Sequence, residues 1–243
     1  MFGRSKIAML VAEFLGTFIL TSIVYTAFLE RLPAYFIAGA AAGVVALMVL
    51  TVGALADVHL NPAVTIAMWT IRKIETTRAV VYIAAQMLGA LAAWRLLEYF
   101  LSTQLKSIAG TSFEMRVLVA EGIGTLILTF IFTAAIYQGL RTLRQAVIMG
   151  GAFAVGILFA SVAGNGLANP AVAAGIRSWS TAYVVGPIIG GLIGANLYAW
   201  VFAPQSTSGL AGVVASARAR ATRATARKTT TRAKTTKRPA RRR

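Results

Sequence analysis

Six apolar stretches constrain the fold of this chain more than any other feature of its sequence. A helix needs about 20 mostly apolar residues to cross a bilayer. Charged residues make up 13% of the chain, about half the roughly 25% of an ordinary soluble domain. We therefore expect an all-α membrane protein rather than a soluble enzyme. The six predicted spans cover residues 7–29, 32–56, 79–100, 117–140, 145–163 and 181–203.

The net charge of +17 is concentrated at one end of the chain. Of the 24 Lys and Arg residues, 12 lie in residues 218–243, which contain no acidic residue. Residues 205–243 are a low-complexity mixture rich in Ala, Thr, Arg and Lys, which predicts a disordered basic tail after a membrane domain of residues 1–204. Such a tail favours anionic lipid headgroups as its partner, with nucleic acid as the alternative.

The chain has no cysteine and one histidine, His59. This composition excludes disulfides, zinc–thiolate sites and multi-histidine metal sites, and a Ser-His-Asp triad would have to use His59. We therefore expect no enzyme activity, no catalytic residues, no metal and no cofactor.

Two further apolar pieces, residues 61–71 and 169–176, are too short to span a bilayer. Each begins with Asn-Pro-Ala, a start signal for a helix, because Asn is a favoured N-cap and Pro is favoured at the first helical position. They predict two re-entrant half-helices. Their start residues are Asn61, Pro62 and Ala63 in the first piece and Asn169, Pro170 and Ala171 in the second.

The two halves of the chain repeat each other with one offset. Three features recur 108 residues apart: the Ala-Glu-x-x-Gly-Thr openings with Glu13 and Glu121, the motifs that begin at Asn61 and Asn169, and Gly43 with Gly151. Each half, about 7–100 and 115–203, holds three spans and one half-helix. Because three is odd, the second half crosses the membrane in the opposite sense, which makes an inverted 3+3 repeat. Such repeats place their functional site near the midplane.

Basic residues near the ends of the spans predict the orientation. If the N-terminus is cytoplasmic, seven basic residues lie on the inner side and five on the outer side, and the tail raises the inner number to 19. We expect both termini in the cytoplasm and the protein in the cell membrane.

The two stretches before the half-helices, residues 53–60 and 164–168, are non-helical backbone at membrane depth. Such backbone is tolerated only where it is buried in protein or lines a watery cavity. Inverted symmetry brings the two half-helix N-termini together, and each carries roughly half a positive charge, which repels cations. Asn61 and Asn169 can cap their helices and still donate to a passing oxygen. The pattern predicts a narrow pore for neutral, hydrogen-bonding solutes.

Over residues 7–203 the sequence resembles the major intrinsic protein family, the aquaporins and glycerol facilitators. The resemblance rests on the paired Asn-Pro-Ala motifs, both Ala-Glu-x-x-Gly-Thr openings, and the stretches 59–65, 85–90 and 185–190. It implies six tilted helices and two half-helices around each pore, with four pores in a homotetramer. It also implies a passive channel for water and small neutral solutes.

The sequence departs from the family at the outer selectivity filter. An arginine usually follows the second Asn-Pro-Ala in the family, and here that position is Val172. Arg177 lies about 140° round a helix from Val172 and is a poor substitute. The other filter positions that the resemblance implies are Ala41 (or Ala42 if the helix is offset by one), Ile157 and Gly166. We expect an apolar, uncharged constriction, wider than that of a strict water channel. A glycerol or small-polyol facilitator is the alternative, and an inverted-repeat secondary transporter is less favoured.

Three ionisable residues remain near the motifs. Glu13 and Glu121 lie inside spans, where such residues are costly and usually functional. A proton relay is one interpretation, and the favoured one, from the family resemblance, is that each carboxylate supports an irregular loop through its backbone N–H groups. His59 either lines the pore and gates it by pH or, as we favour, is a hydrogen-bonded packing residue.

Overall fold

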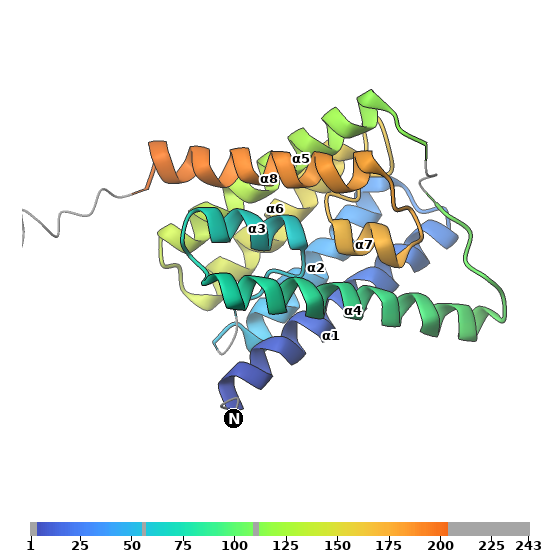
Figure 1. Cartoon of the computed structure of the whole chain (residues 1–243), viewed down its shortest axis with the longest axis horizontal. Helices are drawn as coiled ribbons and strands as arrows, with labels where there is room; N and C mark the ends of the chain where they lie inside the picture. The colour runs from blue at the N-terminus through green and yellow to red at the C-terminus, as the bar shows by residue number, and fades with distance from the viewer. Residues whose placement is uncertain (1–3, 55–56, 109–111, 204–243) are drawn as a thin grey trace, which may run out of the picture. The chain divides into compact units, whose positions relative to one another are not determined.

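The computed structural model describes residues 4–54, 57–108 and 112–203, so the predicted basic tail lies outside the described residues. Eight helices follow one another in this part of the chain, and Figure 1 shows them side by side. They are α1 (Arg4–Leu29), α2 (Ala34–Val52), α3 (Pro62–Thr70), α4 (Thr76–Leu101), α5 (Met115–Tyr137), α6 (Thr142–Ala160), α7 (Pro170–Gly175) and α8 (Thr181–Val201).

Six of these helices are long and apolar enough to cross a membrane, which confirms the six predicted spans. The largest difference is at the end of α2, which stops at Val52 although the apolar sequence continues to Ala56. Gly53 ends this helix as its C-cap. Hydropathy alone does not mark such a turn, because the residues after it are as apolar as those before it.

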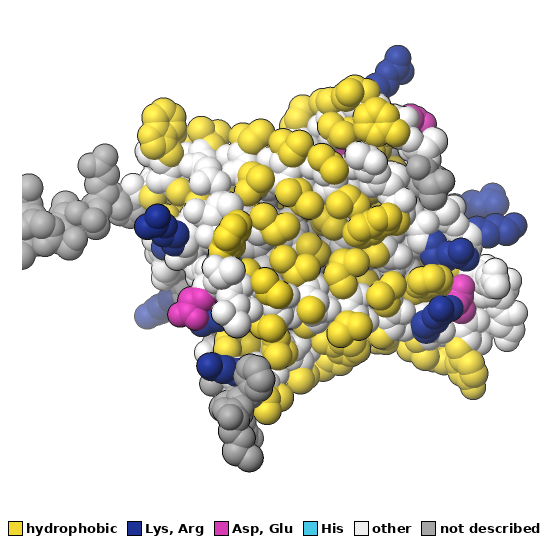
Figure 2. All heavy atoms as spheres, in the orientation of Figure 1, with side chains coloured by type: hydrophobic (Ala, Val, Ile, Leu, Met, Phe, Trp, Pro, Cys, Tyr) yellow, Lys and Arg dark blue, Asp and Glu magenta, His cyan; other side chains and the backbone are white. Residues whose placement is uncertain are grey.

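A broad band of apolar side chains covers the face of the helices in Figure 2, and Lys, Arg, Asp and Glu side chains lie at its two edges. Strongly exposed apolar residues of the helices include Val80 on α4 and Val147 on α6, which are 61% and 65% exposed. Many large apolar side chains are exposed on these helices, and together they form the kind of surface that a lipid bilayer covers. The helices therefore form a multi-pass membrane domain.

The packing of the helices repeats from one half to the other. Helix α1 packs against α2 and α4, and the equivalent α5 packs against α6 and α8. The half-helices also contact the opposite half, since α3 packs against α8 and α7 packs against α4. The two predicted re-entrant pieces thus hold the two halves together.

Glycines allow two of the helix pairs to approach closely. A Cβ atom on Gly190 of α8 would collide with the carbonyl oxygen of Gly122 on α5, and a Cβ on Gly89 of α4 would collide with that of Phe14 on α1. Phe14 and Gly122 are 108 residues apart. Gly89 and Gly190 are therefore equivalent positions in the two halves, and each permits a backbone-to-backbone contact, as small residues do between membrane helices.

We predict that Gly190→Ala destabilises the protein by about 1–3 kcal/mol, because the new methyl group meets backbone that cannot move aside. The measurement is the thermal unfolding midpoint in detergent. Gly39→Ala is the matched control, because nothing lies within 4 Å of a Cβ at that helical position. Equal midpoints for the two variants would show that the α5–α8 contact is not tightly packed.

Candidate functional site

Each half-helix begins at its motif asparagine. The Asn61 side-chain oxygen accepts a hydrogen bond from the N–H of Ala63 at 2.9 Å, and the Asn169 oxygen accepts one from the N–H of Ala171 at 3.0 Å. Proline follows each asparagine in the first turn. Both predicted N-caps are therefore present, and they satisfy helix N–H groups that have no intrahelical acceptor.

The amide group of each asparagine also reaches the other half of the chain. Asn61 Nδ2 donates to the carbonyl oxygen of Ala168, and Asn169 Nδ2 donates to that of Leu60, both at 2.8 Å. Leu60 and Ala168 have φ angles of 53° and 46°, a left-handed conformation that costs a non-glycine residue about 1–2 kcal/mol. Two reciprocal bonds thus join the N-terminal ends of the two half-helices.

Two buried carboxylates hold the backbone that leads into the half-helices. Glu13 accepts hydrogen bonds from the N–H groups of His59 at 2.7 Å and Leu60 at 2.8 Å, one on each oxygen. Glu121 accepts the N–H groups of the two residues before Asn169 in the same way. Both glutamates are fully buried. They satisfy backbone donors that no water could reach in a membrane.

The first half has an additional polar network that the sequence reasoning missed. Gln86 Nε2 donates to Glu13 at 2.6 Å and to the Thr65 hydroxyl at 2.9 Å. The Thr65 hydroxyl also lies 3.1 Å from His59 Nδ1. All of these side chains are buried. The signal in the sequence was a glutamine and a threonine among apolar residues, because polar side chains that are buried need hydrogen-bond partners.

The second half lacks this network. Gln86 lies three residues before Gly89, and the residue three before the equivalent Gly190 is Pro187. Proline has no side-chain donor, so Glu121 receives only the two backbone bonds among the described residues. The loop before Asn61 is therefore held by a network of buried side chains. The loop before Asn169 is held by its carboxylate and through Asn165, whose N–H donates to the Tyr183 hydroxyl at 3.4 Å and whose amide donates to the Ile108 carbonyl oxygen at 3.2 Å.

His59 lies in the segment before α3, buried against two aromatic rings. Its ring meets those of Tyr82 and Phe132 edge-on, with centroid distances of 5.6 and 5.9 Å. Burial lowers the pKa of His59 below its usual range, and nearby Asp57 and Arg78 act on it in opposite directions. A neutral, packed imidazole results.

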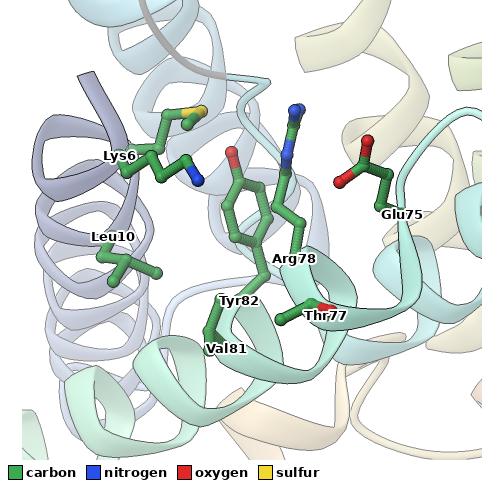
Figure 3. Close-up of a pocket in the computed structure, with 8 residues that line it drawn as sticks. Lys6, Leu10, Glu75, Thr77, Arg78, Val81 and Tyr82 are labelled. Carbon is green, nitrogen blue, oxygen red and sulfur yellow. The ribbon is translucent and has the colours of Figure 1, made fainter. Parts of the chain in front are cut away.

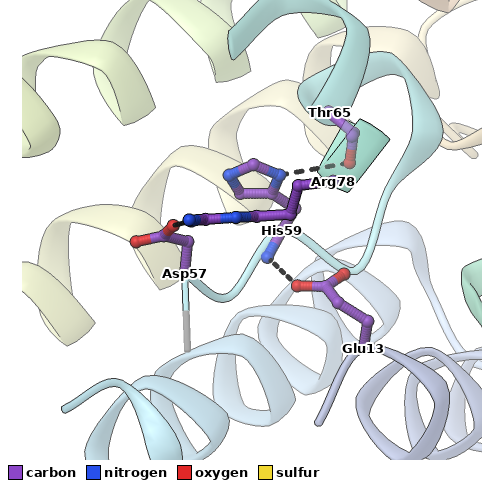
Figure 4. Close-up of polar contacts among 5 residues, drawn as sticks. All are labelled: Glu13, Asp57, His59, Thr65 and Arg78. Carbon is purple, nitrogen blue, oxygen red and sulfur yellow. Dashed lines mark hydrogen bonds and ion pairs between the residues drawn. The ribbon is translucent and has the colours of Figure 1, made fainter. Parts of the chain in front are cut away.

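Asp57 is held close to His59 by an ion pair. Its carboxylate accepts a hydrogen bond from the Arg78 guanidinium at 3.0 Å, as Figure 4 shows together with the His59 contacts to Thr65 and Glu13. The two side chains are 49% and 36% exposed, so the pair contributes at most about 1 kcal/mol to stability. It links the loop before α3 to the first turn of α4.

The four predicted filter positions are all buried in the structure. Ala41, Ile157 and Val172 belong to one apolar cluster. Gly166 lies against Ile157, since a Cβ on Gly166 would be 2.5 Å from the Ile157 carbonyl oxygen. Gly166 also has a φ of +63°, which favours glycine. The set offers no charged side chain.

Arg177 does not replace the missing filter arginine. Its guanidinium donates to the carbonyl oxygen of Leu105 at 2.9 Å and lies 5.3 Å from the centre of the Trp94 ring. These contacts hold the chain between α4 and α5 against the end of α7. The charge of Arg177 is thus used away from Val172. Arg177 lies beyond the end of α7 at Gly175, with a φ of 58°, so the predicted angle of about 140° round a helix does not apply to it.

Comparison with known proteins decides the family. Residues 3–198 match the profile of the major intrinsic protein family. The chain belongs to this family. It is 34% identical to human (Homo sapiens) Aquaporin-4 in an alignment of 177 positions that covers 66% of this chain and 54% of that protein. It is 31% identical to Aquaporin PIP2-4 of Oryza sativa subsp. japonica over 71% of this chain and 68% of that protein.

A solved structure supports the fold. The X-ray structure of the aquaglyceroporin from Plasmodium falciparum aligns with a TM-score of 0.67 and 21% identity, and covers 82% of this chain and 98% of the other. The match to human Aquaporin-4 spans about half of that protein, 54% of its length. The chain is therefore a membrane member of a channel family. Among the described residues, no three His, Asp or Glu side chains lie close enough together to hold a metal ion.

We predict that Glu121→Gln destabilises the protein by about 1–3 kcal/mol, because the amide keeps one acceptor oxygen for two buried N–H donors. Thermal unfolding in detergent measures the effect. The control is Glu114→Gln, which removes a charge from an exposed residue just before the same helix. A midpoint for Glu121→Gln equal to that of the control would contradict the loop-support role.

We also predict that water permeability does not change through His59 between pH 8 and pH 5.5, because the lowered pKa keeps the imidazole neutral across this range. Stopped-flow light scattering of proteoliposomes at several pH values measures it, with His59→Gln as the reference. A step near the ordinary histidine pKa of about 6.5 that His59→Gln abolishes would show that His59 is a pH gate.

Proposed function

We propose that this protein is a passive channel for water and small neutral solutes. One observation carries the proposal: two half-helices meet with their N-termini together, and each motif asparagine uses one amide N–H in the bond to the other half. An amide group has two such hydrogens. The second hydrogen of Asn61 and that of Asn169 have no acceptor among the described residues and can donate to a solute oxygen.

Electrostatics favours neutral solutes in this arrangement. The N-terminal end of a helix carries roughly half a positive charge, and two such ends at one constriction repel cations. The residues at the proposed outer filter add no fixed charge, because Val172 stands in the place of an arginine. Exclusion of cations and protons therefore depends mainly on the two half-helices.

The size of the filter side chains favours a solute larger than water. Ala41 and Gly166 are small and Val172 is much shorter than an arginine, so Ile157 is the bulkiest of the four. We propose that glycerol and other small polyols pass together with water, and a dedicated polyol facilitator is the second candidate. A secondary transporter is less favoured, because both oxygens of Glu13 and of Glu121 already accept backbone N–H groups.

We further propose that both termini are cytoplasmic, that the protein resides in the cell membrane and that it assembles as a homotetramer. The six spans put the start of α1 and the end of α8 on the same side. The excess of basic residues on that side supports the orientation. The tetramer follows from family resemblance.

We predict that Val172→Arg lowers glycerol permeability more than water permeability, because the long cationic side chain narrows the filter for the larger solute. Shrinkage of proteoliposomes in glycerol and in impermeant osmolyte gradients measures both rates by stopped flow. Proton leak, followed with an internal pH dye, should fall in the same variant because a fixed positive charge is restored.

Val172→Leu is the matched control, since it adds bulk without charge. Wild-type rates equal to those of empty vesicles in both gradients would refute the channel. An equal loss of water and glycerol permeability in Val172→Arg would contradict the assignment of position 172 to the filter while leaving the channel intact.

A further inference from the structure

A cavity of about 130 Å³ lies between the first turns of α1 and α4, away from the Asn-Pro-Ala motifs (Figure 3). Its residues come from both helices and from the turn before α4. Cationic side chains and a threonine lie together with apolar ones in its wall. The lining residues are Lys6, Met9, Leu10, Glu75, Thr77, Arg78, Val81 and Tyr82.

A second, more open hollow adjoins this cavity. Arg72, Lys73 and Ile74 line it, and it shares Glu75 and Arg78 with the first cavity. The two hollows together present four cationic side chains, since Lys6 belongs to the first. Glu75 lies among them, and Asp57 pairs with Arg78. The net charge of this surface is therefore positive.

A weakly bonded hydroxyl lies at the cavity. Tyr82 is fully buried, and its hydroxyl has no hydrogen-bond partner of good geometry among the described residues, although the backbone of Asp57 is close enough for a hydrogen bond of poorer geometry. In Figure 3 this hydroxyl lies between the ends of Lys6 and Arg78. A buried donor is rarely left without a good acceptor. Its position beside two cations favours an anionic oxygen as the stronger acceptor.

The order of the side chains matches a phospholipid. The first cavity lies where two membrane spans, α1 and α4, begin, and the second hollow lies at the start of α4. Met9, Leu10 and Val81 follow the cationic residues toward the membrane interior, and the adjacent Val80 faces outward with 61% exposure. A headgroup phosphate near Arg78 would thus have an apolar path for its acyl chain.

We propose that this cavity, defined by Lys6, Arg78 and Tyr82, binds an anionic phospholipid of the leaflet on the N-terminal side. Lys6 and Arg78 pair with the phosphate, and the Tyr82 hydroxyl donates to one of its oxygens. The apolar side chains of Met9, Leu10 and Val81 contact the first part of an acyl chain. This site belongs to the helical domain and is separate from the basic tail, and it does not depend on which solute the protein conducts.

The bound lipid would also act on the loop that leads to the first motif. Arg78 is the partner of Asp57 in that loop, and the Tyr82 ring contacts the His59 ring. A phosphate competes with Asp57 for the Arg78 guanidinium. The lipid composition of the membrane therefore changes how firmly Arg78 holds Asp57, which lies two residues before His59 in the same loop.

The test uses the full chain in vesicles of phosphatidylcholine with a spin-labelled lipid. The chain has no cysteine, so Val80→Cys places a single fluorophore beside this cavity, next to the lining residue Val81. Leu47→Cys, which is equally exposed and five residues before the end of α2 with no Lys or Arg beside it in the sequence, reports on ordinary lipid contact. We expect spin-labelled phosphatidylglycerol to quench the label at position 80 more strongly than spin-labelled phosphatidylcholine, and to show no such preference at position 47.

In the background of Val80→Cys, Lys6→Gln with Arg78→Gln should weaken this preference roughly thirty-fold, since each cation near an anionic surface contributes about fivefold. Arg31→Gln with Lys106→Gln removes the same charge elsewhere and should leave it unchanged. Asp57→Asn should keep or strengthen the preference, because it frees Arg78. All variants retain the tail.

Three results would overturn the proposal. One is an equal preference in the Lys6/Arg78 variant and its charge control. Another is that Asp57→Asn lowers the lipid preference as much as Arg78→Gln does. That result would show that Arg78 serves only in the ion pair with Asp57. The third is complete displacement of the lipid by millimolar inorganic phosphate, which would indicate a site for free anions.

Discussion

The structure depends on the need to satisfy backbone polar groups where the chain is not helical at membrane depth. The segments before Asn61 and Asn169 have N–H groups without helical partners, and water cannot serve them inside packed protein. Glu13 and Glu121 each accept two of these N–H groups. Without the carboxylates, both segments would leave buried donors unpaired, at a cost of about 1–3 kcal/mol each.

The two motif asparagines connect the two halves of the chain. Each caps its own half-helix and donates to the carbonyl of the residue before the other asparagine. The same side chain therefore fixes the start of one helix and the end of the opposite loop. This reciprocity suits an inverted repeat, because the asparagine of each half donates to a loop carbonyl oxygen of the other half.

The two halves are nevertheless unequal in polar support and in charge. The first loop has Gln86, Thr65 and His59 around its carboxylate, whereas the second has none of their equivalents. Cationic side chains lie at the edges of the apolar band, and Arg177 is bound to a loop carbonyl. The four proposed filter residues carry no charge, so in the proposed channel the half-helix ends would be the main barrier to ions.

The sequence by itself determined the six spans, the two half-helices with their asparagine caps, and the inverted repeat. These follow from local or periodic patterns: about twenty apolar residues, the Asn-Pro start, and an offset of 108. The roles of Gln86 and Thr65, the bonds to the Leu60 and Ala168 carbonyls, and the cavity at Lys6 and Arg78 were decided only by the tertiary structure. They join residues far apart in the chain, and no local pattern shows which buried donor meets which acceptor.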